Sequence, residues 1–262
     1  MTDQLFSVTN QVVLVSGGSR GIGKAIAQGF AERGAKVIIS GREQATLDAT
    51  AGEIGTAESP VKAIACDVAD PAAIDELVAA VIGEFGQIDT LLNVAGVNKR
   101  QRAEVFTPEE YDFILDINLR GAFLMSQAVG RHMLERGSGA QINIDSLNTY
   151  APLKGVLPYA MSKAGLSMMT RGLAEEWGPR GVRVNSLAPG FVLTDLTRKL
   201  WSDPTMQKWA GTNTPLGRLG EVEDMVGTCI FLASQASAFM TGQVVYVDGG
   251  MSAGVNWPIP LD

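Results

Sequence analysis

Several residue types are scarce in this sequence, and each scarcity excludes a class of protein. Only two cysteines are present, Cys66 and Cys229, so the chain has neither a disulfide scaffold nor a CxxC-type zinc site. The single histidine, His132, excludes a histidine-rich metal site and argues against a histidine-based catalytic triad. We therefore expect no bound metal, a structural His132, and two cysteines that act as small buried hydrophobic residues.

Long apolar runs and an excess of positive charge are also missing. No run of about 18 apolar residues is present, and the first residues, MTDQLFSVTN, lack the basic start and apolar core of a signal peptide. Lys and Arg number 21 against 28 Asp and Glu, which leaves a net charge of −7. This balance is unfavourable for binding nucleic acid or an anionic membrane. We expect a cytoplasmic protein with a small-molecule partner and no nucleic-acid or membrane partner.

Short apolar runs alternate regularly with helical patterns along the chain. With 262 residues, 46% of them hydrophobic, the chain is long enough for one large α/β domain. Apolar strands that alternate with helices predict a doubly wound, Rossmann-like domain over residues 1–262, with a seven-stranded parallel sheet flanked by helices. The expected strands are 12–16, 36–40, 61–65, 88–93, 140–144, 182–188 and 242–247. The expected helices are 21–33, 43–54, one from Asp70, 107–135, 158–177 and 224–233.

A glycine-rich loop joins the first expected strand to the first expected helix. In the sequence SGGSRGIG, Gly17, Gly21 and Gly23 are spaced G-x3-G-x-G, which differs from the GxGxxG dinucleotide fingerprint. Glycine permits a tight turn and lets backbone amides approach a pyrophosphate at a helix N-terminus. An ordinary strand-to-helix turn would also contain glycine, but the position between strand and helix favours a dinucleotide site.

The end of the second expected strand bears on the choice between NADP and NAD. It reads Ser40-Gly41-Arg42, without the acidic residue that would hold the ribose 2′-hydroxyl of NAD. Arg42 can instead pair with a 2′-phosphate, with Arg20 and Ser40 as further contacts. The sequence therefore predicts NADP rather than NAD, although Glu43 would reach the ribose after a small backbone shift.

A tyrosine and a lysine lie one helical turn apart in the expected helix 158–177. The i, i+4 spacing of Tyr159 and Lys163 places both side chains on one face. An ammonium near a phenol favours the phenolate, so we expect Lys163 to lower the pKa of Tyr159 from its ordinary value of about 10. Tyr159 would then be a general acid or base near neutral pH.

Together with several shorter motifs, these features resemble the short-chain dehydrogenase/reductase family over essentially the whole chain. Two positions differ mildly from the common pattern: Ser16 stands where threonine is usual, and Val94 where a second asparagine is usual. The motifs follow the family's order: the SGGSRGIG loop, Asp67-Val68, Asn93-Val94-Ala95-Gly96, Asn118, Ser146, Tyr159 with Lys163, and Pro189-Gly190.

The resemblance implies a catalytic tetrad of Asn118, Ser146, Tyr159 and Lys163. Tyr159 would exchange a proton with the reacting oxygen, and Ser146 would donate a hydrogen bond to it. Lys163 would bind the nicotinamide ribose, and Asn118 would anchor a water in the proton path. For Asp145, just before the serine, we expect only a strand-end position. The expected cofactor contacts are Gly17, Ser19, Arg20, Gly21, Ile22, Gly23, Ser40, Arg42, Asp67, Val68, Asn93, Ala95, Gly96, Tyr159, Lys163, Pro189, Gly190, Val192 and Thr194.

A basic loop and an irregular segment are the candidates for substrate recognition. Lys99 and Arg100 resemble a basic pair in gluconate 5-dehydrogenases and other sugar-acid dehydrogenases of this family, and their cationic groups would hold a substrate carboxylate. A solvated loop is the alternative. Residues 191–220 lack clear periodicity, so we expect a substrate lid there. The expected substrate contacts are Asn98, Lys99, Arg100, Ser146, Asn148 and Tyr159.

The resemblance favours an NADP-dependent oxidoreductase that interconverts a secondary alcohol and a ketone on a sugar acid, polyol or keto-sugar acid. One alternative is a 3-oxoacyl-thioester reductase that works on acyl carrier protein, which the net charge of −7 does not favour. A non-catalytic nucleotide-sensing protein is the second alternative, although such proteins typically lose the tyrosine or the lysine. The family resemblance also implies a homotetramer that pairs the helices near 107–135 and 159–177 across two-fold axes.

Overall fold

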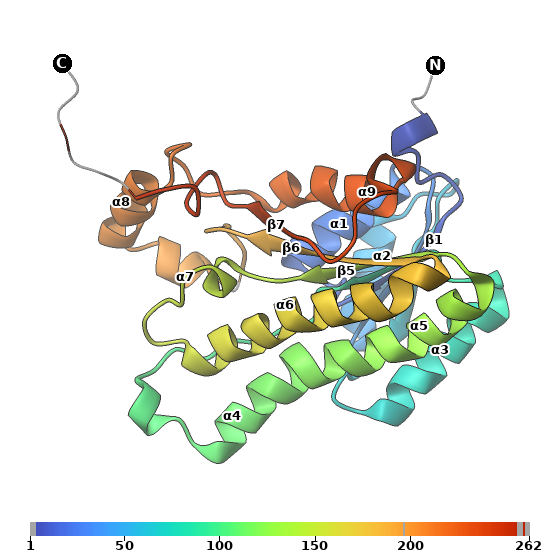
Figure 1. The fold of residues 1–262 in the computed structure, drawn as a ribbon, viewed down its shortest axis with the longest axis horizontal. Helices are drawn as coiled ribbons and strands as arrows, with labels where there is room; N and C mark the ends of the chain where they lie inside the picture. The colour runs from blue at the N-terminus through green and yellow to red at the C-terminus, as the bar shows by residue number, and fades with distance from the viewer. Residues whose placement is uncertain (1–3, 196, 256–258, 260–262) are drawn as a thin grey trace.

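The computed structural model describes residues 4–195, 197–255 and 259, and its central feature is a seven-stranded parallel sheet (Figure 1). The strand order is β3-β2-β1-β4-β5-β6-β7, with every neighbouring pair parallel. This confirms the expected doubly wound, Rossmann-like domain. The strands are β1 (Val12–Ser16), β2 (Lys36–Gly41), β3 (Lys62–Ala65), β4 (Thr90–Asn93), β5 (Gly139–Ile144), β6 (Val182–Pro189) and β7 (Val244–Val247).

Helices cover both faces of the sheet, and the apolar strand sequences explain why. Val13 and Val15 of β1 pack into one core cluster, whereas Val12 and Leu14 pack into the other. Because alternate residues point to opposite faces, a strand that is apolar throughout needs a helical layer on each side. One layer holds α1 (Gly21–Ala31), α2 (Gln44–Ile54) and α9 (Val226–Ala233), and the other holds α3 (Pro71–Phe85), α5 (Ala122–Arg136) and α6 (Leu157–Trp177).

Two helices begin where local sequence signals place them. The Asp70 side chain accepts a hydrogen bond from the backbone N–H of Ala72, and Pro71 occupies the first position of α3. Thr107 and Glu110 form a reciprocal capping box at the start of α4 (Pro108–Leu115). Both starts were readable from the sequence because cap chemistry depends on residues only two or three positions apart.

The expected continuous helix over 107–135 is interrupted by a wider turn. Helix α4 leads into a π-helical turn, Asp116–Gly121, and α5 follows it. The turn lies against residue 68: a Cβ atom built on Gly121 would come within 2.7 Å of the Val68 carbonyl oxygen. Such turns insert an extra residue, and this one contains Asn118. The tertiary contact at Gly121 was not visible in the periodicity of the sequence.

The segment 191–220, which was expected to be irregular, contains two helices. They are α7 (Arg198–Trp201) and α8 (Pro204–Asn213), and they lie at one end of the molecule (Figure 1). Asp203 caps α8 with Pro204 at its first position, a start signal that the sequence analysis missed. Trp201 and Ala210 face a small apolar cluster with Phe191 and Leu147, so the segment is packed onto the body of the domain.

Candidate active site

A cavity of about 440 Å³ opens at the carboxyl ends of the central strands, where ligands bind in doubly wound sheets. It gathers segments that are far apart in the sequence, because every β-strand of a parallel sheet ends at this edge. The expected cofactor residues that line it are Gly17, Ser19, Arg20, Gly21, Ile22, Gly23, Arg42, Asp67, Val68, Ala95, Gly96, Tyr159, Lys163, Pro189, Gly190, Val192 and Thr194.

Two expected cofactor residues do not line the cavity. The amide of Asn93 points into the core, where it donates to Ser126 Oγ and to Asn143 Oδ1, each at 2.9 Å. Ser40 is 1% exposed, and its hydroxyl has no hydrogen-bond partner among the described residues. Further residues, at strand ends, in loops and in helical turns, line the cavity but were not among the expected cofactor contacts, although Glu43 was considered for the ribose. These are Gly41, Glu43, Thr46, Cys66, Val94, Val97, Ile117, Ile144, Asp145, Asp195 and Thr197.

The glycine loop is a close-packed turn with space only for backbone. Gly17 has φ of +87°, and a Cβ atom there would lie 2.5 Å from the Ala95 nitrogen. A Cβ atom on Gly23 would lie 2.1 Å from the Gly17 carbonyl oxygen. Arg20, the residue before α1, makes no side-chain capping hydrogen bond. The first amides of α1 are therefore open toward the cavity, which fits the pyrophosphate of a dinucleotide.

The end of β2 carries positive charge on the cavity wall. Arg20 and Arg42 are exposed and line the cavity at this end. Glu43 also lines it, but its carboxylate accepts a hydrogen bond from Thr46 Oγ1 at 3.0 Å. The acidic side chain that was considered for the ribose of NAD is thus held within its own helix start.

Lys163 is buried beside the ring of Tyr159. Its Nζ atom lies 5.6 Å from the centre of that ring and donates a hydrogen bond to the carbonyl oxygen of Ile144 at 2.6 Å. The lysine is only 4% exposed, and this burial lowers the pKa of Lys163 to about 8. Helix α6 therefore brings the two side chains together, as the i, i+4 spacing predicted.

The expected effect of Lys163 on the acidity of Tyr159 is wrong for this structure. Burial raises the pKa of Tyr159, a hydrogen bond with Ser146 lowers it, and the negative charge of Asp145 raises it further. The ammonium bonds to a backbone carbonyl instead of the phenol oxygen. The effect of burial exceeds that of the Ser146 hydrogen bond, so the pKa of the phenol is raised and not lowered.

Ser146 is held so that its hydroxyl proton is available. Its Oγ atom accepts hydrogen bonds from the backbone nitrogen of Asn148 at 3.1 Å and from the Asn148 side-chain amide at 3.2 Å. The amide oxygen of Asn148 in turn accepts from the Leu153 nitrogen at 2.9 Å. A hydroxyl that accepts two hydrogen bonds has its own O–H left to donate, which suits a group that polarises a reacting oxygen.

Asn118 connects the π-helical turn to the active-site helix. Its side chain accepts from the Val97 nitrogen at 2.8 Å and donates to the Val97 carbonyl at 2.9 Å and to Ser162 Oγ at 3.1 Å. Ser162 then donates to the carbonyl oxygen of Tyr159 at 2.7 Å. This chain of hydrogen bonds fixes the backbone of the tyrosine relative to the loop after β4.

Asp145 is a cavity residue that the sequence analysis left without a role. It directly follows β5, is 2% exposed, and lines the cavity beside Ser146. One carboxylate oxygen accepts from the Ser146 nitrogen at 2.9 Å and from the Thr149 hydroxyl, whereas Oδ2 has no partner among the described residues. An acidic residue immediately after an apolar parallel strand was the signal that could have identified it.

The basic loop after β4 lies at the surface, outside the cavity lining. Asn98, Lys99 and Arg100 are exposed, and the Lys99 ammonium forms an ion pair with the Glu110 carboxylate. The backbone nitrogen of Gln101, the residue after Arg100, donates a hydrogen bond to the Gly155 carbonyl oxygen at 2.9 Å. The structure thus joins this loop to residues 151–156.

An aromatic cluster lies on the segment 191–220, which also contributes residues to the cavity lining. The ring of Phe191 lies 5.4 Å from that of Trp201 and 5.2 Å from that of Trp209, measured between ring centres. Trp201 is 4% exposed, and its indole nitrogen has no hydrogen-bond partner among the described residues. The two tryptophans therefore join helices α7 and α8 to Phe191, which follows the end of β6.

The two cysteines occupy interior positions, and Cys66 is also part of the cavity lining. Cys66 and Cys229 are both buried, as expected, and burial raises the pKa of the Cys66 thiol to about 11. Within residues 4–195, 197–255 and 259, no cluster of three or more His, Cys, Asp or Glu side chains has the arrangement of a metal site. Nor does any helix in those ranges have the length and apolarity to cross a membrane.

Comparison with known proteins identifies the family. Residues 17–252 match a family model described as enoyl-(acyl carrier protein) reductase. The gluconate 5-dehydrogenase of Gluconobacter oxydans (strain 621H) is 38% identical over 248 residues, which cover 95% of this chain and 97% of that enzyme. The 3-oxoacyl-(acyl-carrier-protein) reductase of a Synechocystis species is also 38% identical, over 94% of this chain and 98% of that enzyme.

Solved structures agree with the sequence comparison. The crystal structure of a gluconate 5-dehydrogenase from Burkholderia cenocepacia J2315, in complex with NADP and tartrate, superposes with a TM-score of 0.93. It is 35% identical and covers 96% of this chain and 99% of that one. The chain belongs to the short-chain dehydrogenase/reductase family. It is an oxidoreductase of the kind that uses a nicotinamide cofactor and acts on CH–OH groups of small molecules.

Proposed function

We propose that this enzyme uses NADP to interconvert a secondary alcohol and a ketone on a sugar acid, polyol or keto-sugar acid. The observation that carries the proposal is that Ser146, Tyr159 and Lys163 line the same cavity as the glycine loop. That arrangement brings a proton-exchanging phenol and a hydroxyl donor to the same cavity as a phosphate-binding turn.

Each residue of the tetrad has a different role in the proposed reaction. A nicotinamide held by the glycine loop and Lys163 would supply hydride exchange with the reacting carbon, to the carbonyl carbon in reduction and from the alcohol carbon in oxidation. Ser146 donates a hydrogen bond to the reacting oxygen, and Tyr159 Oη transfers its proton to that oxygen in reduction or accepts it in oxidation. Lys163 holds positive charge beside the phenol, and Asn118 fixes the tyrosine backbone through Ser162.

The preference for NADP follows from charge at the end of β2. Arg20 and Arg42 provide two guanidinium groups on this wall, and a guanidinium binds a phosphate through paired hydrogen bonds. Glu43, the acid that would favour NAD, is bonded to Thr46. The NADP complex of the Burkholderia enzyme supports the same choice.

For the substrate, we propose that a carboxylate is held at the rim of the cavity by Arg100. The loop that carries Arg100 is joined to residues 151–156 by the hydrogen bond from Gln101 to Gly155, and this places Lys154 on the facing loop. Lys99 contributes less, because Glu110 already neutralises it. The tartrate in the Burkholderia complex is a hydroxy acid of this chemical type.

The segment 191–220 is proposed as the lid over this substrate. Helices α7 and α8 carry Trp201 and Trp209, which pack on Phe191 next to the cavity residue Val192. Movement of the packed aromatic cluster would open or close the substrate end without disturbing the glycine loop.

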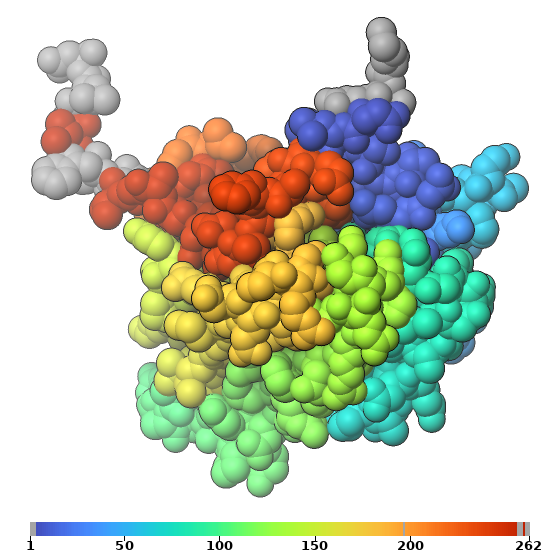
Figure 2. All heavy atoms as spheres, turned by 45° about the vertical axis from the view of Figure 1, so that its right-hand side comes forward, coloured from blue at the N-terminus to red at the C-terminus, as the bar shows by residue number. Residues whose placement is uncertain are grey.

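We also propose a homotetramer. Figure 2 shows α6, in yellow to amber, and α5, in lime green, side by side on one uncovered face. Along these helices and α4 the structure exposes Phe113, Phe123, Met161 and Met168, the last to 64%. Several exposed apolar side chains on an open helical face are typical of a subunit interface, and two-fold pairing of this face satisfies the symmetry of most homo-oligomers.

One assay series tests the substrate and the cofactor together. Gluconate, an uncharged polyol and a 3-oxoacyl thioester are compared with NADP and with NAD, and kcat/KM is measured for each pair. We expect the highest value with NADP and the sugar acid. Arg42→Ala should lower the NADP:NAD ratio by about 10- to 100-fold, and Arg100→Ala should reduce kcat/KM for the acid only.

The same series identifies the outcomes that contradict the proposal. A preference for the 3-oxoacyl thioester would favour the acyl carrier protein reductase alternative, to which the Synechocystis relative is similar. Equal losses on acid and polyol in Arg100→Ala would remove the carboxylate site. Higher kcat/KM with NAD would overturn the cofactor assignment, and light scattering that gives a monomer would overturn the tetramer.

A further inference from the structure

We infer that Asp145 is a positioning residue whose buried carboxylate balances the charge of Lys163, keeps the phenol of Tyr159 protonated, and so sets the pH at which ketone reduction gives way to alcohol oxidation. The inference rests on the proposed roles of Tyr159 and Lys163. It concerns a residue for which family resemblance suggested no role, and it links the direction of the reaction to one charge behind the reacting groups.

Asp145 is placed beside the tetrad by the register of the sheet. Its backbone nitrogen donates to the Leu187 carbonyl at 2.7 Å, so the residue extends β5 toward the cavity. Ile144, the residue before it, packs in the core cluster of α1 and α9. Since alternate residues of a strand point to opposite faces, the Asp145 side chain lies on the other face, which α6 covers. Helix α6 carries both Tyr159 and Lys163.

The hydrogen bonds of Asp145 hold its carboxylate in place without neutralising it. Both donors, the Ser146 backbone nitrogen and the Thr149 hydroxyl, reach Oδ1. No cation bonds to either oxygen, and Oδ2 has no hydrogen-bond partner within the described residues. A buried carboxylate with one free oxygen exerts its field on the groups around it, because little water is present to screen it.

Lys163 needs a negative charge close by. It is 4% exposed, and its described hydrogen bond goes to a neutral carbonyl, that of Ile144. A buried ammonium is stable in its charged form only when an opposite charge is near. Asp145 is the charged group that acts on Lys163 and on Tyr159 at this site. One member of this pair of opposite charges, Lys163, therefore belongs to the tetrad, and the other, Asp145, precedes the tetrad residue Ser146 in the chain.

Further titratable groups face this region from β7, from the turn after β5 and from α6. Tyr246 on β7 is influenced by Asp145, and also by Arg171 of α6, Asp248 and Tyr150. Tyr150 packs edge-on against Tyr246, with 6.2 Å between ring centres. Arg171, Asp248 and Tyr150 influence the pKa of Tyr246. Asp145 influences the pKa values of Tyr159, Lys163 and Tyr246.

The sign of the effect is the same for both catalytic groups. A nearby negative charge favours the protonated form of a phenol and of an amine, so it raises the pKa of each. Reduction of a ketone needs the neutral phenol, and oxidation of an alcohol needs the phenolate. Asp145 thus favours reduction at neutral pH and moves the onset of oxidation to higher pH.

The test is Asp145→Asn, which removes the charge but keeps an oxygen for the Ser146 and Thr149 donors. The pH dependence of kcat/KM for alcohol oxidation should shift to lower pH by about one unit, the size expected for one buried charge nearby. At neutral pH, oxidation should then rise by up to about tenfold. Asp248→Asn, which alters an aspartate at the same edge after β7, is the matched control and should leave the profile unchanged.

A second readout does not depend on turnover. Ionisation of Tyr159 is followed by ultraviolet difference titration, with the same protein carrying Tyr159→Phe as the reference. The midpoint should be lower in Asp145→Asn than in the unchanged protein. If no substrate is oxidised, the proposed function fails, and this titration still decides the inference about Asp145.

Three results would overturn the inference. They are an unchanged profile with an unchanged titration midpoint, an equal shift in Asp248→Asn, and a loss of activity at every pH without a shift, which would mean a purely structural role. Should Asp145→Asn fail to fold, Asp145→Ser, which also removes the charge, provides the measurement. The profile and the midpoint should then move in the same direction as expected for Asp145→Asn.

Discussion

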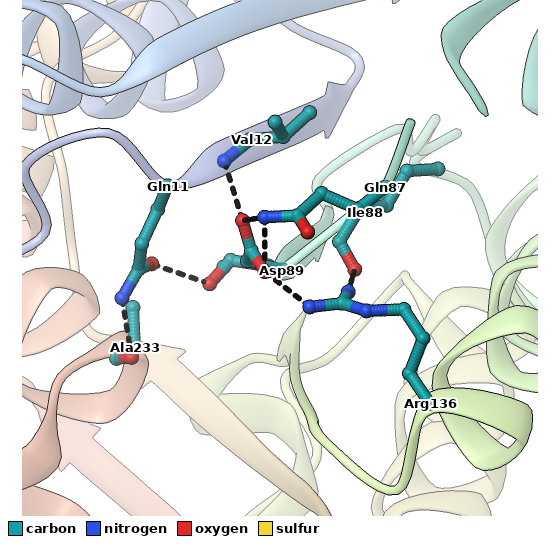
Figure 3. Close-up of polar contacts among 8 residues, drawn as sticks. Gln11, Val12, Gln87, Ile88, Asp89, Arg136 and Ala233 are labelled. Atoms are coloured by element: carbon teal, nitrogen blue, oxygen red, sulfur yellow. Dashed lines mark hydrogen bonds and ion pairs between the residues drawn. The ribbon is translucent and has the colours of Figure 1, made fainter. Parts of the chain in front are cut away.

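Two aspartates at opposite edges of the sheet have opposite surroundings. Asp89, at the amino edge next to β4, accepts hydrogen bonds from the Val12 nitrogen and from Arg136, each at 2.8 Å, and from Gln87 (Figure 3). The Arg136 guanidinium also bonds the Ile88 carbonyl, which ties α5 to this edge. Asp145, at the carboxyl edge, has no cation bonded to it and one oxygen without a partner in the part of the chain that the structure describes.

The difference shows how the two edges divide stability and function. At the amino edge both carboxylate oxygens of Asp89 accept hydrogen bonds, and these hydrogen bonds connect β1, β4 and α5. At the carboxyl edge charged groups are buried with incomplete partners, which costs stability but keeps their fields directed at the cavity. A reactive site needs groups whose protonation can change. A side chain whose polar atoms all have fixed hydrogen-bond partners would be held in one protonation state.

The largest effect is expected from Tyr159→Phe at the carboxyl edge. Loss of the phenol oxygen removes the proton exchange, so kcat should fall by about 100- to 10,000-fold. Cofactor binding should stay nearly intact, because the glycine loop is untouched. Turnover assays and calorimetric titration with NADP measure the two quantities. Near-normal turnover would show that another group exchanges the proton.

Asp89→Asn at the amino edge should have the opposite profile. The change removes the negative charge of the carboxylate that accepts hydrogen bonds from Arg136 and from the Val12 nitrogen. This should lower the free energy of unfolding by about 2 kcal/mol. The kcat and its pH dependence should not change, since the residue lies at the far edge of the sheet. Urea denaturation and the pH–rate profile measure the two effects. A shifted profile would contradict the division between the edges.

Lys163→Met tests the cost of the buried ammonium. Burial lowers the pKa of Lys163 to about 8, so the folded protein loses this proton at lower pH than the unfolded chain. The ammonium therefore destabilises the fold below that pH, and stability due to this group rises as pH increases toward its unfolded pKa. The inactive variant should be more stable at neutral pH by on the order of 1–2 kcal/mol. Denaturation at neutral and at alkaline pH should show this difference shrinking; a constant difference would refute the explanation.

The smallest effect is expected for the stability of Asp145→Asn. Burial raises the pKa of Asp145, so the stability that its neutral form provides at low pH is lost as pH rises through the folded-state pKa. Asparagine stays neutral, and the variant should gain up to about 1 kcal/mol at neutral pH. Thermal denaturation beside Asp89→Asn gives the comparison directly. Equal destabilisation of both variants would mean that the two aspartates have the same role.

Sequence reasoning succeeded where the physics is local or periodic. Apolar runs predicted all seven strands, and the caps at Asp70 and Thr107 were correct to the residue. The spacing of Tyr159 and Lys163 predicted their proximity, because a helix repeats every 3.6 residues. Most of the expected cofactor residues line one cavity, since parallel strands end at a common edge.

It failed where the outcome depended on burial or on contacts between distant segments. Asn93 shares a motif with cavity residues, yet its amide is used by Ser126 and Asn143 in the core. The acidity of Tyr159 was misjudged because local spacing contains no information about desolvation. In the structure the Lys99 ammonium forms an ion pair with Glu110, which lies eleven positions further along the chain. The sequence analysis did not include this ion pair.

The sequence by itself determined the layered α/β fold, the glycine-rich turn after β1 and the proximity of Tyr159 and Lys163. Each follows from the pattern of apolar residues, from the conformational freedom of glycine, or from the helical spacing of nearby positions. Only the tertiary structure decided the burial and the pKa shifts of Tyr159 and Lys163 and the place of Asp145 in the cavity lining. Protonation depends on the removal of water and on charges brought close by other strands and helices, and neither is defined until the chain has folded.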